Sequence, residues 1–397
     1  MSALADPRFR RLLTGQSMSS FGDTALYLSL GIWAKDLTGQ NAAAGAVFLC
    51  LSLPVLFSPL SGHLVDRWRR RRTLIVVNLV TGVGVLALLG VHSAADLWII
   101  YAVAFGYGLS FTLRRPAQAS LIKMILPGDD LAGANAAVRT IGEAIRLLSP
   151  LAGSALYSAI GGRALVGLTS VTFAVAIVML LSISLREPRP IPAKGNTLRE
   201  ITAGAAHLAR TPLLAFTSVA VAVSFAVLGL LDSVDFAVID EGLGRPASFF
   251  GVLMAIQGAG GICGGLLATR LIQRYGEART VGVGQLSVAI GTALLAAPNL
   301  PVVIGGFVSI GFGLPWLMVG YMTAWQRYAS QEIVGRVAAA ADLCTVGPQT
   351  VSIALGVVLI SVVDYRVLLG VCFVVLTACG VVLIRAATRI AIKQPVE

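Results

Sequence analysis

The sequence predicts an all-α polytopic membrane protein with twelve transmembrane helices arranged in two six-helix bundles. The chain has 397 residues, of which 56% are hydrophobic and only 12% are charged, whereas a soluble domain carries about twice that charge. Apolar stretches of about 20 residues, each long enough to cross a bilayer as a helix, recur along the whole chain. One long polar segment divides these stretches into six and six.

The individual spans follow from the apolar stretches taken in order. They are predicted near residues 12–34, 42–63, 74–92, 96–117, 134–158, 164–185, 212–238, 247–271, 279–297, 300–324, 335–361 and 365–388. The first stretch has no small-residue cleavage site after it, so it is predicted to be a retained helix. An even number of spans returns the C-terminus to the side of the N-terminus.

The positive charge is distributed unevenly between the two predicted faces. The formal net charge is +11, but nucleic-acid binding would need these residues on one soluble face, and most of them lie instead in loops on one side of the membrane. By the positive-inside rule that side is cytoplasmic. The sequence therefore predicts a multi-pass protein of the cell inner (plasma) membrane, with both termini cytoplasmic and no nucleic-acid partner.

The polar segment in the middle sets the predicted domain boundaries. Residues 1–185 form the N-terminal bundle, residues 186–211 a cytoplasmic linker and residues 212–397 the C-terminal bundle. The linker begins with a proline-rich run and continues into 197–210, where apolar residues recur at helical spacing. This pattern favours an extended connection followed by a short helix on the membrane surface.

A cluster of charged residues at 62–74 lies between two apolar stretches and must remain in water. Its residues 66–74 align with residues 273–281 at the same place in the second half. The Ser-Pro pair at 149–150 likewise has a Gly-Pro counterpart at 347–348. Such an internal repeat predicts a binding site between the halves, near the middle of the bilayer.

The charged cluster at 62–74 contains a family motif. It resembles the loop motif of the major facilitator superfamily, Gly-x-Leu-x-Asp-Arg-x-Gly-Arg-Arg, at Gly62, Leu64, Asp66, Arg67, Arg70 and Arg71, and departs from it at Arg69. Segments 115–121, 131–135 and 335–337 look like the branch that holds macrolide-efflux and enterobactin-exporter proteins. The resemblance implies the twelve-helix fold and secondary transport, with protons and a small-molecule substrate as partners of a monomeric protein.

The resemblance also implies a cytoplasmic latch, in which Asp66 and the arginines near it lock the second helix to the fourth and eleventh. The implied residues are Gly62, Asp66, Arg67, Arg70, Arg71, Arg114, Arg115 and Arg139. Arg114 or Arg115 is the expected partner of Asp66. The second half has Gln273 in place of the acid, so its latch is expected to be weaker. Pro150 and Gly153 match a helix-kink motif of proton-coupled exporters, although serines replace two of its glycines.

Ionisable residues inside the spans are the candidates for proton coupling, because a proton gradient does work only through a group that binds and releases the proton. Arg139, Glu143 and Arg146 share one face of the fifth predicted helix. They form either a gate for substrate or proton or a structural ion network. Arg146 lies too deep to reach the surface and is the stronger functional candidate.

Four aspartates complete the candidates. Asp23 lies half-way along the first helix and either binds a proton, lines a cavity or makes a packing hydrogen bond. Asp232 and Asp235 lie towards the outer end of the seventh helix, where a solvated vestibule is the alternative. Asp342, in the eleventh helix, is expected to pair with a cation rather than to carry a proton.

Several other chemistries are not predicted. The chain has no phosphate-binding loop of the ATPase type, and the glycines of the run 258–265 have the spacing that packs membrane helices together. The five cysteines and three histidines lack metal-ligand spacing. We therefore expect no enzyme activity, no metal site and no cofactor.

Together these features predict a proton-coupled exporter of small amphipathic compounds that works by alternating access. Aromatic residues in many spans favour an apolar or aromatic substrate. Two alternatives stay open, a transporter of one siderophore or other metabolite in either direction, and a membrane sensor or scaffold that transports nothing.

Overall fold

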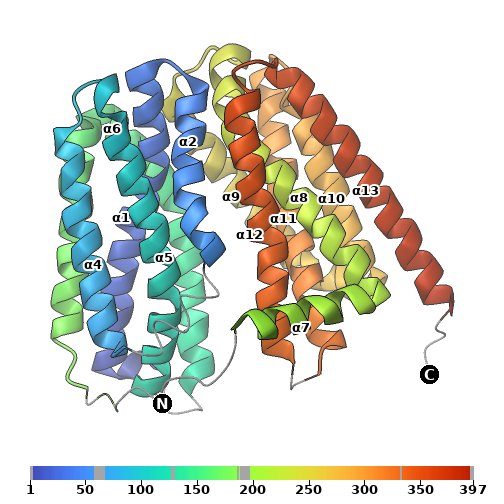
Figure 1. Ribbon diagram of the computed structural model, residues 1–397, viewed down its shortest axis with the longest axis horizontal. Helices are drawn as coiled ribbons and strands as arrows, with labels where there is room; N and C mark the ends of the chain where they lie inside the picture. The colour runs from blue at the N-terminus through green and yellow to red at the C-terminus, as the bar shows by residue number, and fades with distance from the viewer. Residues whose placement is uncertain are drawn as a thin grey trace. The chain divides into compact units, whose positions relative to one another are not determined.

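The computed structural model describes residues 3–57, 68–126, 130–185, 187, 197–330 and 333–393, and almost all of these residues are helical. The helices of the first half are α1 (Pro7–Thr38), α2 (Asn41–Ser52), α4 (Arg70–Leu86), α5 (Leu97–Ile125) and α6 (Leu131–Leu181) (Figure 1). Those of the second half are α7 (Thr197–Arg210), α8 (Pro212–Ala237), α9 (Phe250–Tyr275), α10 (Glu277–Leu294), α11 (Leu300–Tyr328), α12 (Val334–Leu359) and α13 (Tyr365–Lys393). The helical architecture confirms the predicted fold class.

The chain forms two compact units, Met1–Lys194 and Gly195–Glu397. The boundary lies within the predicted linker, and α7 belongs to the second unit, where it packs against α12 and α8. The predicted helix at 197–210 is confirmed as α7. The backbone of Arg336 approaches Gly204 so closely that a Cβ atom at Gly204 would overlap it, so a glycine is needed where α7 crosses α12.

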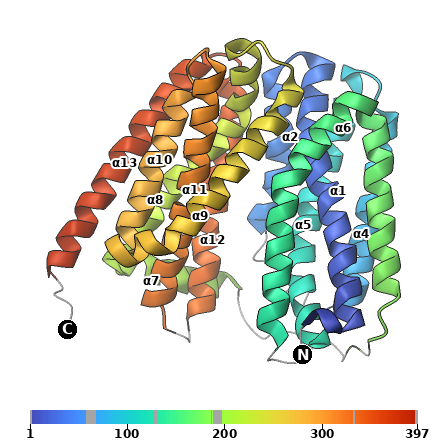
Figure 2. The same ribbon diagram turned by 180° about the vertical axis from the view of Figure 1, so that it is seen from behind.

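Two predicted spans, 134–158 and 164–185, are both contained in α6. The backbone leaves the helical conformation at Gly161, which has φ 77° and ψ 167°. From there the second arm of α6 runs back in the opposite direction to the first, with α1 between the two arms (Figure 2). Positive φ is readily available only to glycine. A single glycine therefore makes the turn that separates the fifth span from the sixth.

Eight helical segments among the described residues are long and apolar enough to cross a membrane. One of them, Thr140–Leu181, contains the two spans of α6, and Asn41–Phe57 is a shorter apolar helix that coincides with part of the second predicted span. The predicted first and ninth spans correspond to α1 and α10, which are more polar. The element order thus matches the predicted order of spans in both halves.

Glycines allow close helix contacts in both units. In the second unit, Cβ atoms at Gly260 and Gly264 would lie 2.8 and 2.6 Å from backbone oxygens of α11, which confirms the predicted packing role of this run. In the first unit, Gly15 and Gly22 bring α1 against the second arm of α6. On the other side, a Cβ atom at Gly153 would overlap the backbone of Ala25.

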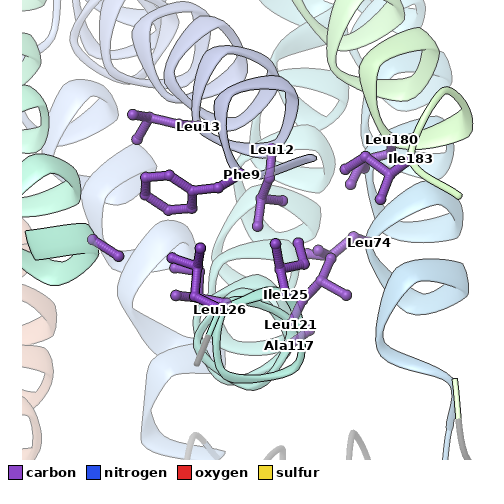
Figure 3. Close-up of a cluster of buried hydrophobic side chains, with 12 residues drawn as sticks. Phe9, Leu12, Leu13, Leu74, Ala117, Leu121, Ile125, Leu126, Leu180 and Ile183 are labelled. Carbon is purple, nitrogen blue, oxygen red and sulfur yellow. The ribbon is translucent and has the colours of Figure 1, made fainter. Parts of the chain in front are cut away.

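An apolar cluster fills the first unit at the end that carries the N-terminus (Figure 3). It combines side chains from α1, α4, α5 and α6: Phe9, Leu12, Leu13, Leu74, Ala117, Leu121, Ile122, Ile125, Leu126, Ala134, Leu180 and Ile183. Close van der Waals packing of these side chains stabilises the junction of the four helices. We call this group the terminal apolar cluster.

Candidate functional site

An ion pair inside the first unit joins two of the residues singled out in the sequence. Arg114 on α5 donates through Nη2 to Oδ2 of Asp23 on α1. The two side chains are only 8% and 15% exposed. Arg114 also donates through Nη1 to the hydroxyl of Ser19, at 3.4 Å. The pair therefore lies in the interior of the bundle rather than on its surface.

Two aromatic side chains border the pair. The guanidinium of Arg114 lies over the ring of Phe173, 5.8 Å from its centroid, and this ring meets that of Tyr107 edge-on at 6.1 Å. Tyr107 is buried, and its hydroxyl lies next to the Asp23 carboxyl group without completing a hydrogen bond of ordinary geometry. Aromatic faces favour a nearby cation, so they hold the guanidinium in place while the carboxylate neutralises it.

The terminal apolar cluster lies beside the pair along each helix. On α1, Leu12 and Leu13 belong to the cluster, whereas Gln16, Ser19 and Asp23 follow them on the same face. On α5 the order is reversed, because the helix is antiparallel to α1, and Tyr107, Ser110 and Arg114 precede the apolar residues. We call this zone the polar layer. The terminal apolar cluster closes it towards the end that carries the N-terminus.

A buried ion pair is weak evidence for a stabilising role. Two well-packed apolar residues often stabilise a protein as much as a buried pair does, whereas removal of one partner costs about 3–5 kcal/mol because the other charge stays buried. Ionisable residues inside membrane segments usually mark pathways for ions or substrates. The Asp23–Arg114 pair is therefore the strongest candidate functional site in the first unit.

The other predicted residues of the first unit lie elsewhere or are only partly described. Arg139 and Glu143 are on the first arm of α6, where the structure does not describe their side chains. Arg146, on the same arm, is exposed within its unit. Pro150 lies inside α6, and Gly153 provides the close contact with α1. The gate proposed for Arg139, Glu143 and Arg146 stays a prediction.

The predicted latch is also only partly described. Gly62, Asp66 and Arg67 lie outside the described residues, so the pairing of Asp66 with Arg114 or Arg115 stays a prediction. Arg114 contacts Asp23, a pairing that the sequence reasoning did not propose. Arg115 is exposed, and its guanidinium lies over Phe111 at 5.4 Å.

Arg71, another predicted latch residue, contacts the end of α6 within its own unit. Its Nε and Nη2 donate to the carbonyl oxygens of Leu180 and Leu181, at 2.7 and 2.8 Å. Arg11 similarly donates to the carbonyl oxygen of Ser182 at 2.7 Å. Cations are stabilising at helix C-termini because carbonyl groups there lack helical partners. Both arginines thus cap the second arm of α6.

The second unit holds a pair of carboxyl groups on α8. Asp235 is 6% exposed, and its Oδ1 has no hydrogen-bond partner among the described residues. Asp232, one turn earlier, is half-buried and hydrogen-bonds to the side chain of Gln349 on α12. Asp342 on α12 is exposed within the unit. The ion pair seen in the described part of this unit, Arg327–Glu277, involves neither carboxyl group of α8.

An ion pair at the start of α10 was missed in the sequence. The buried Glu277 accepts from Nη1 of Arg327, near the end of α11, at 2.9 Å. The acid of the first half, Asp66, aligns with Gln273, so the repeat predicts no acid at the equivalent position. Glu277 aligns with Arg70 in the repeat. Comparison of the two halves does not point to an acid at this position, because the aligned residue has the opposite charge.

No group of three or more histidine, cysteine, aspartate or glutamate side chains in the described ranges is placed to hold a metal ion. The buried polar groups of the first unit include the positively charged Arg114, which disfavours a second cation beside Asp23.

Comparison with known proteins gives the family. The model of the Major Facilitator Superfamily matches residues 12–237 and 233–396. An uncharacterized MFS-type transporter of Bacillus subtilis strain 168, YfiS, is 23% identical over 382 residues, which cover 94% of this chain and 91% of that protein. The proposed bacilysin exporter BacE of Bacillus subtilis is 24% identical over 390 residues, with 95% and 93% covered.

Solved structures share the fold at low identity. A bacterial homologue of the iron transporter ferroportin in an inward-facing state superimposes with a TM-score of 0.75 and 17% identity, covering 96% of this chain and 99% of that one. The nucleoside transporter NupG gives a TM-score of 0.75 at 14% identity, with 96% and 98% covered. Since the family match extends over nearly the whole sequence, the chain belongs to the Major Facilitator Superfamily and is a membrane transporter rather than an enzyme.

Proposed function

We propose that this transporter is a proton-coupled exporter of small amphipathic compounds, and that Asp23 is the residue that binds the proton. The observation that carries the proposal is the buried Asp23–Arg114 pair. Burial inside a bundle disfavours the charge of a carboxylate, whereas a neighbouring guanidinium favours it. A small change in its surroundings can therefore shift the proton on or off.

The proposed step is a proton transfer that rearranges the pair. When Asp23 takes up a proton, its carboxyl group becomes neutral and its attraction to Arg114 weakens. The guanidinium keeps its charge, since arginine does not deprotonate in proteins, and it must then find other acceptors. Ser19 and the ring of Phe173 already contact it. Protonation thus changes the packing of α1 against α5.

In the proposed cycle, the two halves expose a central site alternately to the two sides of the membrane. The positive-inside rule supports cytoplasmic termini. Proton entry from the outside returns the transporter to the state that accepts substrate from the cytoplasm. Asp232 and Asp235 are further candidates for this coupling, because both carboxyl groups lie on α8, one half-buried and the other buried.

Inside-out membrane vesicles test the proposal. Respiration acidifies the vesicle interior, and a pH-sensitive dye reports whether an added compound releases protons from it. We expect dye recovery with at least one compound of a panel of lipophilic cations, macrolides and small peptides in vesicles that hold the wild-type protein. We expect none with Asp23→Asn, and wild-type behaviour with the control Asp364→Asn, an exposed loop residue.

Two outcomes would count against the proposal. Recovery with Asp23→Asn at the wild-type rate would show that another group binds the proton. No recovery with any compound, together with unchanged cellular accumulation of ethidium after protonophore treatment, would contradict proton-coupled export of amphipathic compounds.

Export of one specific metabolite is the second candidate, and the likeness to BacE over 95% of the chain supports it. The same vesicles separate the two candidates. A narrow exporter responds to bacilysin or one related compound at low concentration and not to the lipophilic cations, whereas a broad exporter responds to several unrelated amphipathic compounds.

A further inference from the structure

Asn78 is a buried polar residue that the transport cycle proposed above does not use. It lies on α4 and is 0% exposed, and neither its Oδ1 nor its Nδ2 has a hydrogen-bond partner among the described residues. An amide group that is buried in this way without partners is strongly unfavourable. Native proteins satisfy nearly all such groups with protein atoms or with ordered water.

The neighbours of Asn78 on α4 place it in the polar layer. Leu74, one turn before it, belongs to the terminal apolar cluster. Gly82, one turn after it, faces Phe173, since a Cβ atom there would lie 3.1 Å from the Phe173 side chain. Residues spaced by four lie on one face of a helix, and Phe173 contacts Arg114. Asn78 therefore points into the same interior zone as the ion pair.

Other buried polar atoms of the polar layer also lack partners in the described part of the chain. They come from four helices that enclose the layer: Gln16 Nε2 on α1, Ser110 Oγ and Arg114 Nε on α5, and Thr169 Oγ1 on α6, together with both amide atoms of Asn78. The set contains three donors, one acceptor and two hydroxyls that can either donate or accept. A cation or an anion would satisfy only one kind, whereas water satisfies both.

The second half of the protein offers a comparison at the equivalent position. If the alignment of 66–74 with 273–281 is continued along α4 and α10, Gln285 stands opposite Asn78. Gln285 is equally buried, but its Nε2 donates to the carbonyl oxygen of Ala220 at 3.3 Å. Nearby on α8 and α11, Ser218 and Tyr321 hydrogen-bond to each other at 2.9 Å. The Oε1 of Gln285, like the Oδ1 of Asp235, has no partner among the described residues. At this position the second unit therefore satisfies one of the two amide atoms within the protein, and the first unit satisfies neither.

We infer that Asn78 holds a cluster of buried water molecules in the polar layer, and that these waters carry the proton to and from Asp23. Asn78 is a positioning residue, because it acts through the waters and not on the proton directly. The terminal apolar cluster closes the layer at the end that carries the N-terminus, so bulk solvent does not reach the waters from that end. The part of the inference that concerns the proton rests on the proposed function; the hydration does not.

Hydroxyl-radical footprinting of the purified full-length protein tests the hydration directly. Radicals formed by X-rays from bound water modify buried aromatic side chains only where water lies next to them. Tyr107 is the reporter in the polar layer, and Tyr321, which is equally buried and paired with Ser218, is the internal reference. We expect Tyr107 to be modified at least several-fold faster than Tyr321.

Two variants link the hydration to Asn78. Asn78→Leu has a similar volume but no hydrogen-bonding group, and we expect it to lower Tyr107 modification several-fold. Thr81→Val is the matched control on the same helix, because the Thr81 hydroxyl already donates to the carbonyl oxygen of Val77 at 2.7 Å; we expect wild-type modification. If Asn78→Leu does not fold, Ser110→Ala takes its place, with a smaller decrease in the same direction.

The transport readout separates this inference from the proposed function. In the inside-out vesicles, with ethidium as probe, we expect Asn78→Leu to slow proton release several-fold while Thr81→Val does not. Equal modification of Tyr107 and Tyr321 in the wild-type protein would show a dry layer and overturn the inference, even if Asp23 proves to couple protons. A hydrated layer with wild-type proton release in Asn78→Leu would overturn the proton role of the waters. Absence of any proton release by the wild type refutes the proposed function and leaves the footprinting result to stand alone.

Discussion

At the scale of single residues, the chain holds few charges inside its helices, and one pair stands out. Asp23 was a candidate from the sequence because a carboxylate half-way along an apolar helix is costly. Its partner was not predicted, because 91 residues separate Arg114 from Asp23 and the sequence does not tell which helices adjoin. Arg114 was assigned to the latch from its place near the end of the fourth span. Packing of α5 against α1 brings it to Asp23, and its place in the latch stays a prediction.

At Arg69 the chain departs from the family motif, and the backbone geometry explains this departure. The motif has glycine at this position, and Gly276, which aligns with Arg69, has φ 79° and needs a glycine. Arg69 itself has φ −70° and ψ 119°, a conformation that any residue can adopt. The first half therefore reaches α4 by a different backbone path, and arginine is tolerated there.

The first prediction concerns the energetic coupling of the ion pair. Arg114→Gln and Asp23→Asn should each lower the free energy of unfolding by about 3 kcal/mol, because each leaves one charge buried without its partner. The double variant should recover most of this loss. Thermal unfolding of the four purified proteins in detergent measures the cycle. Losses that simply add in the double variant would show that the two side chains do not interact.

At the scale of helices, the sequence predicted the order of the elements and most of their positions. The period and length of the apolar stretches carry this information, and the amphipathic pattern at 197–210 was sufficient to predict α7. The sequence did not predict that one glycine, Gly161, would make the whole connection between two spans. Nor did it assign Gly153 to packing, since the helix that lies opposite is known only from the fold.

The second prediction tests the contact between α6 and α1. Gly153→Ala should destabilise the protein by about 1–3 kcal/mol, because the added methyl group overlaps the backbone of Ala25 and forces the helices apart. Gly167→Ala on the same helix is the control, since nothing lies within 4 Å of a Cβ atom there, and helix propensity should leave it unchanged or slightly more stable. Equal melting temperatures for the two variants would contradict the close contact.

The third prediction concerns the cap of α6. Arg71→Ala removes two charged hydrogen bonds to the carbonyl oxygens of Leu180 and Leu181, and we expect a loss of about 1–2 kcal/mol, reduced by partial exposure to solvent. Arg72→Ala, an exposed neighbour, should change stability by less than about 0.5 kcal/mol. Denaturation monitored by circular dichroism compares them. A larger loss for Arg72→Ala would contradict the capping role of Arg71.

At the scale of the whole molecule, the two units repeat one architecture but differ in their interiors. The first unit places a salt bridge and several polar atoms without protein partners in its polar layer. In the second unit, Gln285, Ser218 and Tyr321 form hydrogen bonds within the protein. The internal repeat was visible in the sequence, whereas this difference was not, because it depends on which side chains meet across the helices.

The fourth prediction tests how the chain is threaded through the membrane. If the arginine-rich loops are cytoplasmic, alkaline phosphatase fused after Lys393 should be inactive, and the same enzyme fused after Gly39, in the first predicted outer loop, should be active. The order of the spans predicts this contrast. An active fusion after Lys393 would contradict the assigned orientation.

The claim that Asp23 binds the coupled proton is tested most directly by a comparison of gradient-driven transport with exchange of substrate. Purified protein is placed in liposomes that are more acidic either inside or outside. The accumulation of ethidium under this pH gradient is then compared with the exchange of ethidium across the membrane when the pH is equal on both sides. The wild type should do both. Asp23→Asn should keep exchange within about threefold of the wild-type rate, because the substrate route is intact, and lose accumulation, because no proton binds at residue 23. Gradient-driven accumulation that survives in Asp23→Asn would contradict the assignment of Asp23 as the proton-binding residue.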